Sequence, residues 1–417
     1  MQLIYSFLIM CYGLTIRIAS VFNKKAAWWV KGRRNYWTIL STTFASSPFN
    51  IPGRKLAWFH CASLGEFEQG RPIIEAFRQQ HPGYLILLTF YSPSGYEVRK
   101  AYKGADLILY LPLDTRSNVR KFVDTVKPDL VFYVKYEFWF NFLSYLQAKQ
   151  IPTMLVSATF RPDQHFFKAY GGWARKKLGG FTMIFVQNKE SKDLLQSAGI
   201  KNVALSGDTR FDRVAAVAVK PFDIEIARSF SQNHLVLVAG STWPADEELI
   251  LKLLENNSHK LRLIIAPHEI NTAHIESLLQ RAGKNAVRLS KTNANDAKNA
   301  EILLIDTIGI LSHLYQYGTI AYLGGGFGAG IHNILEASAF GLPVFFGPNY
   351  QKFNEAKDLI RLKGAFEVNT ATELISKTDA LLSDKLNIQK ASAISKKYVT
   401  DGCGATGIIL NYVNGIS

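Results

Sequence analysis

The chain has 417 residues, of which 48% are hydrophobic and 19% are charged. This length suits two domains, and the apolar content excludes a largely disordered protein, because burial can offset the entropy of ordering. Its three cysteines (Cys11, Cys61 and Cys403) form no Cys-x-x-Cys or Cys/His cluster, which argues against a disulfide framework or a structural zinc site. The net charge of +15 indicates an anionic partner; nucleic acid is disfavoured because no nucleic-acid-binding motif accompanies the charge.

The first part of the chain combines an apolar segment with a one-sided charge. Residues 1–22 are apolar apart from Arg17 and a few small polar residues, and residues 1–65 contain no Asp or Glu. Basic residues of 24–34 alternate with Trp28 and Trp29, a mixture that suits the headgroup layer of a membrane. We interpret residues 1–22 as an uncleaved membrane anchor, either spanning the bilayer or lying in its interface. The basic flank then places the rest of the chain in the cytoplasm. The alternative is a buried N-terminal helix followed by a basic connector.

From residue 55 onward, short apolar runs alternate with helical stretches, which predicts parallel sheets covered on both faces. In the first half, the predicted strands are 56–60, 84–90, 106–112, 129–134, 153–158 and 183–188, with helices such as 67–80 and 189–198. The pattern restarts after Pro221, with strands 234–240, 262–267, 301–306, 319–324 and 342–347 and helices 244–256, 271–282, 332–340 and 353–362. The polar stretch 290–300 is a predicted surface loop.

The pattern predicts an α/β protein of three parts. An anchor and basic connector (1–35) precede an N-terminal Rossmann-like domain (36–215) and a C-terminal Rossmann-like domain (216–417), whose last helix is free to pack back on the first domain. The linker is predicted within 210–232. No G-x-G-x-x-G fingerprint or Walker A motif is present, so neither NAD nor ATP is favoured. Two doubly wound domains facing a cleft are similar to the GT-B architecture of glycosyltransferases.

A candidate general base follows the first predicted strand. The sequence HCASLGE (60–66) predicts a tight turn and a helix beginning near Glu66. Strand carboxyl ends face the ligand crevice of a doubly wound sheet, so Glu66 is expected there, where it could take a proton from an attacking hydroxyl. A helix N-terminus favours the ionised carboxylate, so we expect low basicity. The helix dipole alone also explains an acid at this position, and Glu68 competes for the same role. His60 and Cys61 are interpreted as strand-end packing.

The densest constellation of small and polar residues is GGGFGAGIHNILEASAFGLPVFFGPNYQKFN (324–354). Its glycines, among them Gly326, Gly328 and Gly330, let the backbone approach an anion, and the helix that follows offers unpaired N–H groups. Within this stretch His332 and Asn333 can add donors, Glu336 can accept hydrogen bonds from ribose hydroxyls, and Asn354 can close the pocket. Ser241 and Thr242 end another strand and either contact the ligand or cap a helix. The alternative for the glycines is tight strand–helix packing.

Taken together, these motifs make the chain similar to the Kdo (3-deoxy-D-manno-octulosonic acid) transferases of lipopolysaccharide assembly. The family signatures resemble HCASLGE (60–66), YEFWFN (136–141), GDTRFD (207–212), DTIG (306–309) and the segment from Gly330 to Asn354. The resemblance covers nearly the full length and implies a GT-B fold.

The resemblance also implies an activity. The donor would be CMP-Kdo, the acceptor an anionic lipid A precursor (lipid IVA), and the transfer inverting, with no metal and no cofactor. The location would be the cytoplasmic face of the inner membrane. Glu66 falls on the family's general base and Glu137 on an acidic position of the acceptor side. The donor contacts fall on His332, Asn333 and Glu336, with Ser241 and Thr242 near the phosphate or sugar.

Three positions depart from the family pattern. The segment IIAPHEI (264–270) lacks the usual arginine, and His268 stands in for the usual histidine. Ile310 and Leu311 replace a Glu-Leu pair, and Lys135 occupies a position that is often acidic. Two alternatives stay open from the sequence: a GT-B transferase that uses a UDP-sugar on another membrane lipid, and a non-catalytic protein that binds a membrane surface.

Overall fold

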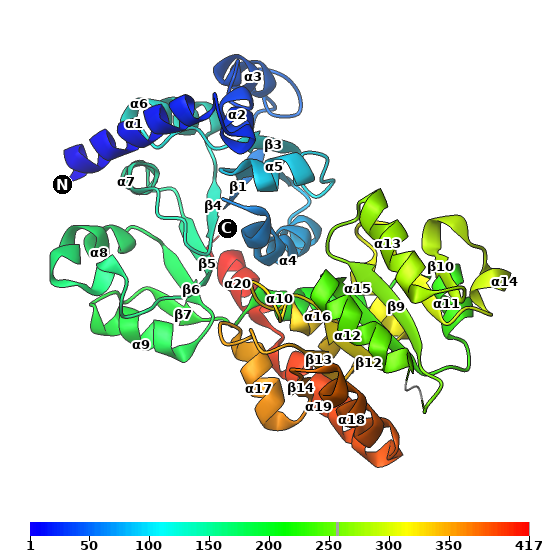
Figure 1. The fold of residues 1–417 in the computed structure, drawn as a ribbon. Coiled ribbons are helices and arrows are strands. Elements are labelled where there is room, and N and C mark those ends of the chain that lie inside the picture. The colour runs from blue at the N-terminus through cyan, green and yellow to red at the C-terminus, as the bar shows by residue number, and fades with distance from the viewer. Residues whose placement is uncertain (256–257, 417) are drawn as a thin grey trace. The chain divides into compact units, whose positions relative to one another are not determined.

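The computed structural model describes residues 1–255 and 258–416. The chain forms two compact units: unit 1 is Met1–Asp212 with Gly404–Ser417, and unit 2 is Arg213–Cys403. Each unit is built on a seven-stranded sheet whose paired strands are all parallel. Figure 1 shows both sheets with helices packed around them. The two doubly wound α/β units predicted from the sequence are therefore confirmed.

The sheet of unit 1 has the strand order β3-β2-β1-β4-β5-β6-β7. Its strands are β1 (Lys55–Cys61), β2 (Tyr84–Phe90), β3 (Leu107–Tyr110), β4 (Leu130–Val134), β5 (Thr153–Ala158), β6 (Met183–Val186) and β7 (Val203–Leu205). Its helices are α1 (Gln2–Ala19), α2 (Lys24–Lys31), α3 (Tyr36–Phe44), α4 (Leu64–Gln80), α5 (Pro93–Arg99), α6 (Arg116–Val126), α7 (Phe140–Ala148), η1 (His165–Phe167), η2 (Ala169–Gly171), α8 (Gly172–Leu178), α9 (Lys189–Ser197), α10 (Thr209–Val219), which runs on into unit 2, and α20 (Ala405–Asn414).

The sheet of unit 2 has the strand order β10-β11-β9-β8-β12-β13-β14. Its strands are β8 (Val236–Thr242), β9 (Arg262–Pro267), β10 (Ala286–Arg288), β11 (Ile302–Leu304), β12 (Ile320–Leu323), β13 (Val344–Phe346) and β14 (Ala365–Glu367). Its helices are α11 (Glu225–Ser231), α12 (Pro244–Glu255), α13 (Thr272–Ala282), η3 (Leu289–Lys291), α14 (Ala294–Ala297), α15 (Leu311–Leu314), η4 (Tyr315–Tyr317), α16 (Ile334–Ala339), α17 (Asn354–Leu362), α18 (Ala371–Leu382) and α19 (Lys385–Gly402).

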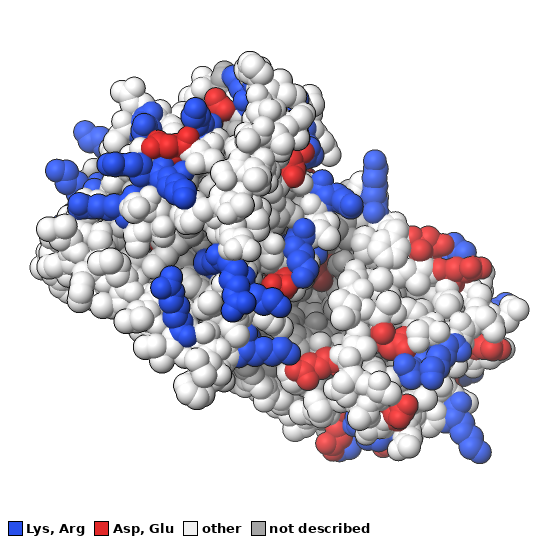
Figure 2. Space-filling model, turned by 90° about the horizontal axis from the view of Figure 1, so that it is seen from above, with Lys and Arg blue, Asp and Glu red and all other residues white. Residues whose placement is uncertain are grey.

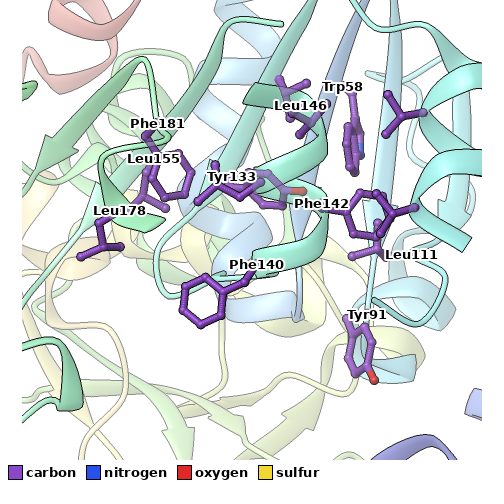
Figure 3. Close-up of a cluster of buried hydrophobic side chains, with 14 of the residues drawn as sticks. Trp58, Tyr91, Leu111, Tyr133, Phe140, Phe142, Leu146, Leu155, Leu178 and Phe181 are labelled. Atoms are coloured by element: carbon purple, nitrogen blue, oxygen red, sulfur yellow. The ribbon is translucent and has the colours of Figure 1, made fainter. Parts of the chain in front are cut away.

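Alternate residues of each central strand enter different cores, which explains why these strands are apolar without alternation. In β1, Trp58 enters the core that α6 and α7 cover, whereas Phe59 enters the core that α4 and α20 cover. Figure 3 shows the first of these cores, where Trp58 packs edge-on against Tyr133 of β4 and Phe142 of α7. The indole Nε1 of Trp58 donates to Thr89 Oγ1 at 2.8 Å, so this large side chain buries no unpaired polar atom.

Helix α1 is apolar on its exposed side, and on its other side it is hydrogen-bonded to the rest of unit 1. Among the described residues it is the one helix long and apolar enough to cross a membrane. The Tyr5 hydroxyl donates to Asp114 Oδ2 at 2.6 Å, and Ser6 contacts Asn141 at 3.4 Å. Leu3 and Phe7 are exposed by 73% and 60%. The helix therefore presents an apolar face outward while its polar side chains attach it to unit 1.

Asp212 lies at one of the two points where the chain passes from one unit to the other, and its carboxylate binds the backbone at the second point. Its Oδ1 accepts from the Gly404 N–H at 2.6 Å, and its Oδ2 accepts from the Thr406 N–H at 2.7 Å. The carboxylate thus satisfies two N–H groups at the start of α20, groups that no helical carbonyl can reach. Helix α20 then buries Ile409 and Val413 in the core shared with α4.

Several boundaries differ from the sequence-based expectation. The expected linker within 210–232 contains most of α10 and all of α11, because its apolar residues follow a helical period. The expected loop 290–300 contains the single turn α14, which buries Ala297. Position 256, to which one predicted helix extended, lies outside the described residues. The helix predicted from 332 begins at Ile334, because Asn333 acts as its N-cap.

Asp114 gives a test of how α1 is held. Its buried carboxylate accepts from Tyr5 and from the N–H groups of Asn141 and Phe142 at 2.6–3.1 Å. We expect Asp114→Ala to lower the unfolding free energy of unit 1 by about 3 kcal/mol, because three donors lose their acceptor. Asp124→Ala is the control, because that exposed carboxylate accepts only at the surface, and its loss should be much smaller. Denaturant unfolding in detergent measures both; equal losses would contradict the anchoring role.

Candidate active site

The candidate residues of each unit lie where its strand order reverses. In unit 1 the order reverses between β1 and β4, and Glu66 and Glu137 follow those two strands. In unit 2 the order reverses between β8 and β12; Ser241 and Thr242 end β8, and the glycine-rich loop follows β12. Ligands of open parallel sheets bind outside the strand carboxyl ends at such a point. The topology therefore gives each unit one candidate half-site.

Glu66 is fixed by the turn between β1 and α4. Ser63 is the N-cap of α4, and its hydroxyl accepts from the Glu66 N–H while the Glu66 carboxylate reaches back to the cap. Glu66 Oε2 accepts from the Ala62 N–H at 2.5 Å and from the Ser63 N–H at 3.2 Å. This capping box holds one carboxylate oxygen, whereas Oε1 accepts no hydrogen bond from the residues that the structure describes.

The basicity of Glu66 is higher than the sequence indicated. Burial and the negative charge of Glu137 raise its pKa to about 8, outweighing the two backbone hydrogen bonds and the positive charge of Lys135. The expectation of low basicity rested on the helix dipole alone, which contributes about 0.3–1 kcal/mol at a helix N-terminus. The structure corrects that expectation, because burial beside a second carboxylate has the larger effect.

Glu137 is buried and bonded to two ring nitrogens. Its Oε2 lies 3.1 Å from His60 Nε2 and accepts from Trp139 Nε1 at 2.5 Å. On the other side of the His60 ring, Nδ1 lies 2.9 Å from Thr89 Oγ1. The ring therefore connects β1, β2 and the segment after β4, and it fixes the carboxylate whose charge acts on Glu66.

His60 and Trp139 are positioning residues that sequence reasoning missed. His60 was interpreted as strand-end packing; it is buried, as expected, but it also contacts Glu137. Its neighbour Cys61 does pack in the core, where burial raises the pKa of its thiol. The competing acid Glu68 forms an ion pair with Arg99 at 2.7 Å. The available signal for this hydrogen-bonded pair was a His at the end of one buried strand and an acid shortly after another buried strand.

In unit 2, the glycine-rich loop is tied to the start of α12 by a residue that sequence reasoning also missed. Asp246 is 1% exposed, and its carboxylate accepts from the N–H groups of Gly325 and Trp243 and from the Tyr322 hydroxyl, each at 2.9 Å. Burial raises the pKa of Asp246 above its usual range. The sequence signal was an acid three residues after Trp243, at the position of a capping interaction.

The glycines of this loop divide into two groups. A Cβ on Gly324 would lie 2.2 Å from Ser241 O, one on Gly326 would lie 2.5 Å from the Gly347 nitrogen, and Gly325 has φ +90°. These three serve tight packing, as the alternative interpretation held. Gly328 has space for a side chain, and Gly330 has φ +129° at the partly exposed tip of the loop. The tip is therefore where the backbone can approach a ligand.

Three aromatic rings stack beside the loop. The ring of His268 lies 4.8 Å from that of Trp243 and 4.5 Å from that of His332. His268 and Trp243 are exposed, and His332 is half-buried. Burial and the neighbouring His268 lower the pKa of His332. The imidazole of His268 is thus exposed where the ends of β8 and β9 meet the glycine-rich loop.

The other residues of unit 2 that were predicted to contact the donor differ in burial and in hydrogen bonding. Asn333 donates through Nδ2 to Glu336 Oε1 at 3.2 Å, so these two lie together. Thr242 is 1% exposed and its hydroxyl donates to Glu247 at 3.2 Å, which agrees with a structural role. Ser241 is half-buried with φ +54°, and Asn354 is exposed at the start of α17.

Over residues 1–255 and 258–416, no group of three His, Cys, Asp or Glu side chains suits a metal ion.

Comparison with known proteins places the chain in a family. Residues 38–213 match the family model described as 3-deoxy-D-manno-octulosonic-acid transferase (kdotransferase). The 3-deoxy-D-manno-octulosonic acid transferase of Aquifex aeolicus is 32% identical over 340 residues, which cover 80% of this chain and 87% of that protein. The transferase of the same name from Haemophilus influenzae is 25% identical over 366 residues, covering 85% of each chain.

Solved structures show the same fold. The UDP-GlcNAc 2-epimerase of Neisseria meningitidis aligns with a TM-score of 0.59 and 17% identity, over 86% of this chain and 99% of that one. Acinetobacter baumannii MurG aligns with a TM-score of 0.54 and 12% identity, over 87% and 99%. These likenesses confirm the predicted GT-B fold class. With its sheets, its two half-sites and its relatives considered together, the chain belongs to the Kdo transferase family, the glycosyltransferases that transfer Kdo in lipopolysaccharide synthesis.

Proposed function

We propose that this protein transfers Kdo from CMP-Kdo to a hydroxyl of a lipid A precursor (lipid IVA), with inversion at the anomeric carbon and without a metal. The observation that carries the proposal is Glu66, a half-buried carboxylate at the reversal point of the unit 1 sheet whose pKa is raised to about 8. A general base works best when its pKa lies near the operating pH. Glu66 meets that condition better than an exposed carboxylate would.

The proposed reaction is a single displacement. Glu66 takes the proton from the acceptor hydroxyl, and that oxygen forms a bond to the anomeric carbon of Kdo. The bond between this carbon and the phosphate oxygen of CMP breaks, and its electron pair leaves with CMP. Attack from the side opposite the leaving group inverts the carbon. The buried Glu137, held by His60 and Trp139, raises the basicity of Glu66 and stands on the acceptor side.

On the donor side, we assign the leaving phosphate to the tip of the glycine-rich loop and to the two stacked imidazoles. His268 and His332 can each donate a ring N–H to a phosphate oxygen, at the place where the family arginine is absent. Asn333 and Glu336 offer a donor and an acceptor to the ribose and base. Helix α16 has only six residues, so its dipole contributes less than the sequence suggested.

The membrane provides the acceptor in this proposal. Residues 1–65 contain eight Lys or Arg and no acid, and α1 exposes an apolar face. Both features suit a protein held at the cytoplasmic face of the inner membrane, where the phosphorylated lipid is attracted to the basic segment.

One assay tests the function. The full chain in detergent is given CMP-Kdo generated in situ and a tetraacylated, bisphosphorylated lipid A precursor, and the products are read by mass spectrometry. A gain of one or more Kdo residues, unchanged by a chelator, supports the proposal. A gain only when UDP-sugars replace CMP-Kdo would overturn the donor assignment.

Glu66→Gln removes the proposed base while keeping the side-chain volume. We expect kcat to fall by about 10²–10⁴-fold, the usual contribution of general base catalysis. Glu68→Gln is the matched control, because that acid pairs with Arg99 and lies in the same helical turn; its kcat should change little. Near-normal turnover by Glu66→Gln, with both proteins equally stable, would remove Glu66 from the mechanism.

Glu137→Gln tests the coupling of the two acids. Below about pH 8 Glu66 carries a proton and cannot accept another, so the rate should rise with pH through that value. Removing the charge of Glu137 lowers the pKa of Glu66, so the rising limb of log kcat against pH should move to lower pH. This displacement is separate from any loss in the maximal rate. A limb that stays in place would show that Glu137 does not act on the base.

His268→Ala and His332→Ala test the donor side. Each variant removes a possible hydrogen bond to a charged phosphate, an interaction of about 1.5–3 kcal/mol, so the KM for CMP-Kdo should rise by roughly 10- to 100-fold. His259→Ala is the control, because that imidazole pairs with Asp379 instead. An unchanged KM in both variants would contradict the assignment of the phosphate to these rings.

A further inference from the structure

Unit 1 contains a cavity that the proposed reaction does not use. It has a volume of about 510 Å³ and lies among α1, α2, the start of α3 and the segment after β3. Figure 1 shows α1, α2 and α3 as neighbours in the part of the chain coloured dark blue, and α1 and α2 are in direct contact. The residues that matter here are Met10, Leu14, Arg17, Trp29, Arg33, Arg34 and Tyr36.

The cavity carries positive charge without a compensating acid. Three of its lining residues are arginines, and no Asp or Glu lines it. Arg17 and Arg34 are exposed, and neither guanidinium forms an ion pair within the described part of the chain. Figure 2 shows that Lys and Arg side chains also outnumber Asp and Glu over the left part of the visible face. An anion entering the cavity would therefore meet only attraction.

Arg33 is enclosed yet bonded only to neutral groups. Its guanidinium donates to Leu111 O at 2.8 Å and to the carbonyls of Trp29 and Tyr91 at 3.1 Å. It stacks 3.8 Å from the Trp29 ring and 4.6 Å from the Tyr110 ring. Burial lowers the pKa of Arg33 to about 10, which still leaves it charged at neutral pH. An enclosed charge that carbonyls and rings alone surround is stabilised further by an anion.

Two buried donors of this cavity have no acceptor. Trp29 and Tyr36 are 7% and 6% exposed, and neither Trp29 Nε1 nor the Tyr36 hydroxyl has a hydrogen-bond partner among the described residues. Buried polar groups are nearly always hydrogen-bonded in folded proteins. Both atoms are covered in this structure, so an acceptor reaches them only when a side chain of the cavity wall moves.

The cavity continues into an apolar surface. Met10, Leu14 and Arg17 are spaced by four and three residues, so they share one face of α1, and Met10 and Leu14 are 53% and 59% exposed. Farther along the helix, Leu3 and Phe7 are also exposed. The arginines suit the anionic head group of an amphiphile, and the exposed apolar residues of α1 suit its hydrocarbon chain. Inorganic phosphate would contact only the arginines.

We propose that this cavity binds the phosphate head group of an anionic phospholipid of the bilayer, with one acyl chain lying along the exposed face of α1. The phosphate contacts Arg17 and Arg34 at the mouth, beside Arg33 and the Trp29 ring on which Arg33 stacks. Neither Glu66 nor Glu137 lines this cavity, so the site positions the enzyme on the membrane and does not depend on the proposed reaction.

The first test compares two double variants that lose the same charge from the same segment. Arg17→Gln/Arg34→Gln removes two lining cations, and Lys25→Gln/Lys31→Gln removes two that do not line the cavity. Binding of the full chain is measured by flotation with phosphatidylcholine vesicles with and without phosphatidylglycerol. We expect the arginine variant to lose about tenfold more affinity for the phosphatidylglycerol vesicles than the lysine variant. Equal losses would show diffuse attraction and overturn the proposal.

The second test identifies the ligand. The indole N–H signal of Trp29, assigned by its absence in Trp29→Phe, is followed by NMR while a ligand is added to the full chain in detergent. A shift with short-chain phosphatidylglycerol at concentrations where inorganic phosphate has no effect supports the proposal. A shift with inorganic phosphate at the same concentration would reduce the cavity to a simple anion site. A shift with the lipid A precursor but not with phosphatidylglycerol would assign the cavity to the acceptor instead. Because neither test measures transfer, failure here leaves the proposed function untouched.

Discussion

Burial of both sheet faces is the constraint on which the rest of this structure depends. A parallel strand covered by helices on each side must be apolar at successive positions, so polar chemistry is confined to the strand ends. Both units obey this rule: β1 and β8 are buried almost throughout, and their functional candidates begin within a few residues of their carboxyl ends. The same burial then sets the properties of those residues, because a carboxylate at the edge of such a core is only partly hydrated.

Glu66 shows how competing local effects are resolved. The capping box and the helix N-terminus stabilise its charged form, and both are visible in the sequence. Burial and the charge of Glu137 oppose them, and they prevail. Glu137 in turn depends on His60, whose ring is held by Thr89 of the neighbouring strand. The basicity of one residue therefore reflects three strands that are distant in sequence but adjacent in the sheet.

The sequence predicted the elements that depend on a local residue pattern. It missed the contacts that form only when distant segments of the chain pack together. Long strands such as β2 and β5 were found within a residue, because every position is buried and most are apolar. The three-residue strands β7, β10 and β14 were missed, because polar residues flank them closely, whereas the equally short β11 and β13 lie within longer apolar runs. At the site, Glu66 was identifiable from a motif. The contacts of Glu137, the role of Asp246 and the stacking of His268 on His332 arise only when separate strand ends meet.

The Asp212 carboxylate has a consequence for the modular construction of the chain. Because it binds the backbone at Gly404 and Thr406, the two ends left by removing residues 213–403 already lie within hydrogen-bonding reach of each other. Unit 2 is therefore an insertion whose two joints coincide, and chain termini placed so close together are what allow whole domains to be exchanged. Recombination at this junction would replace unit 2 while every strand of the first sheet and helix α20 kept its partners.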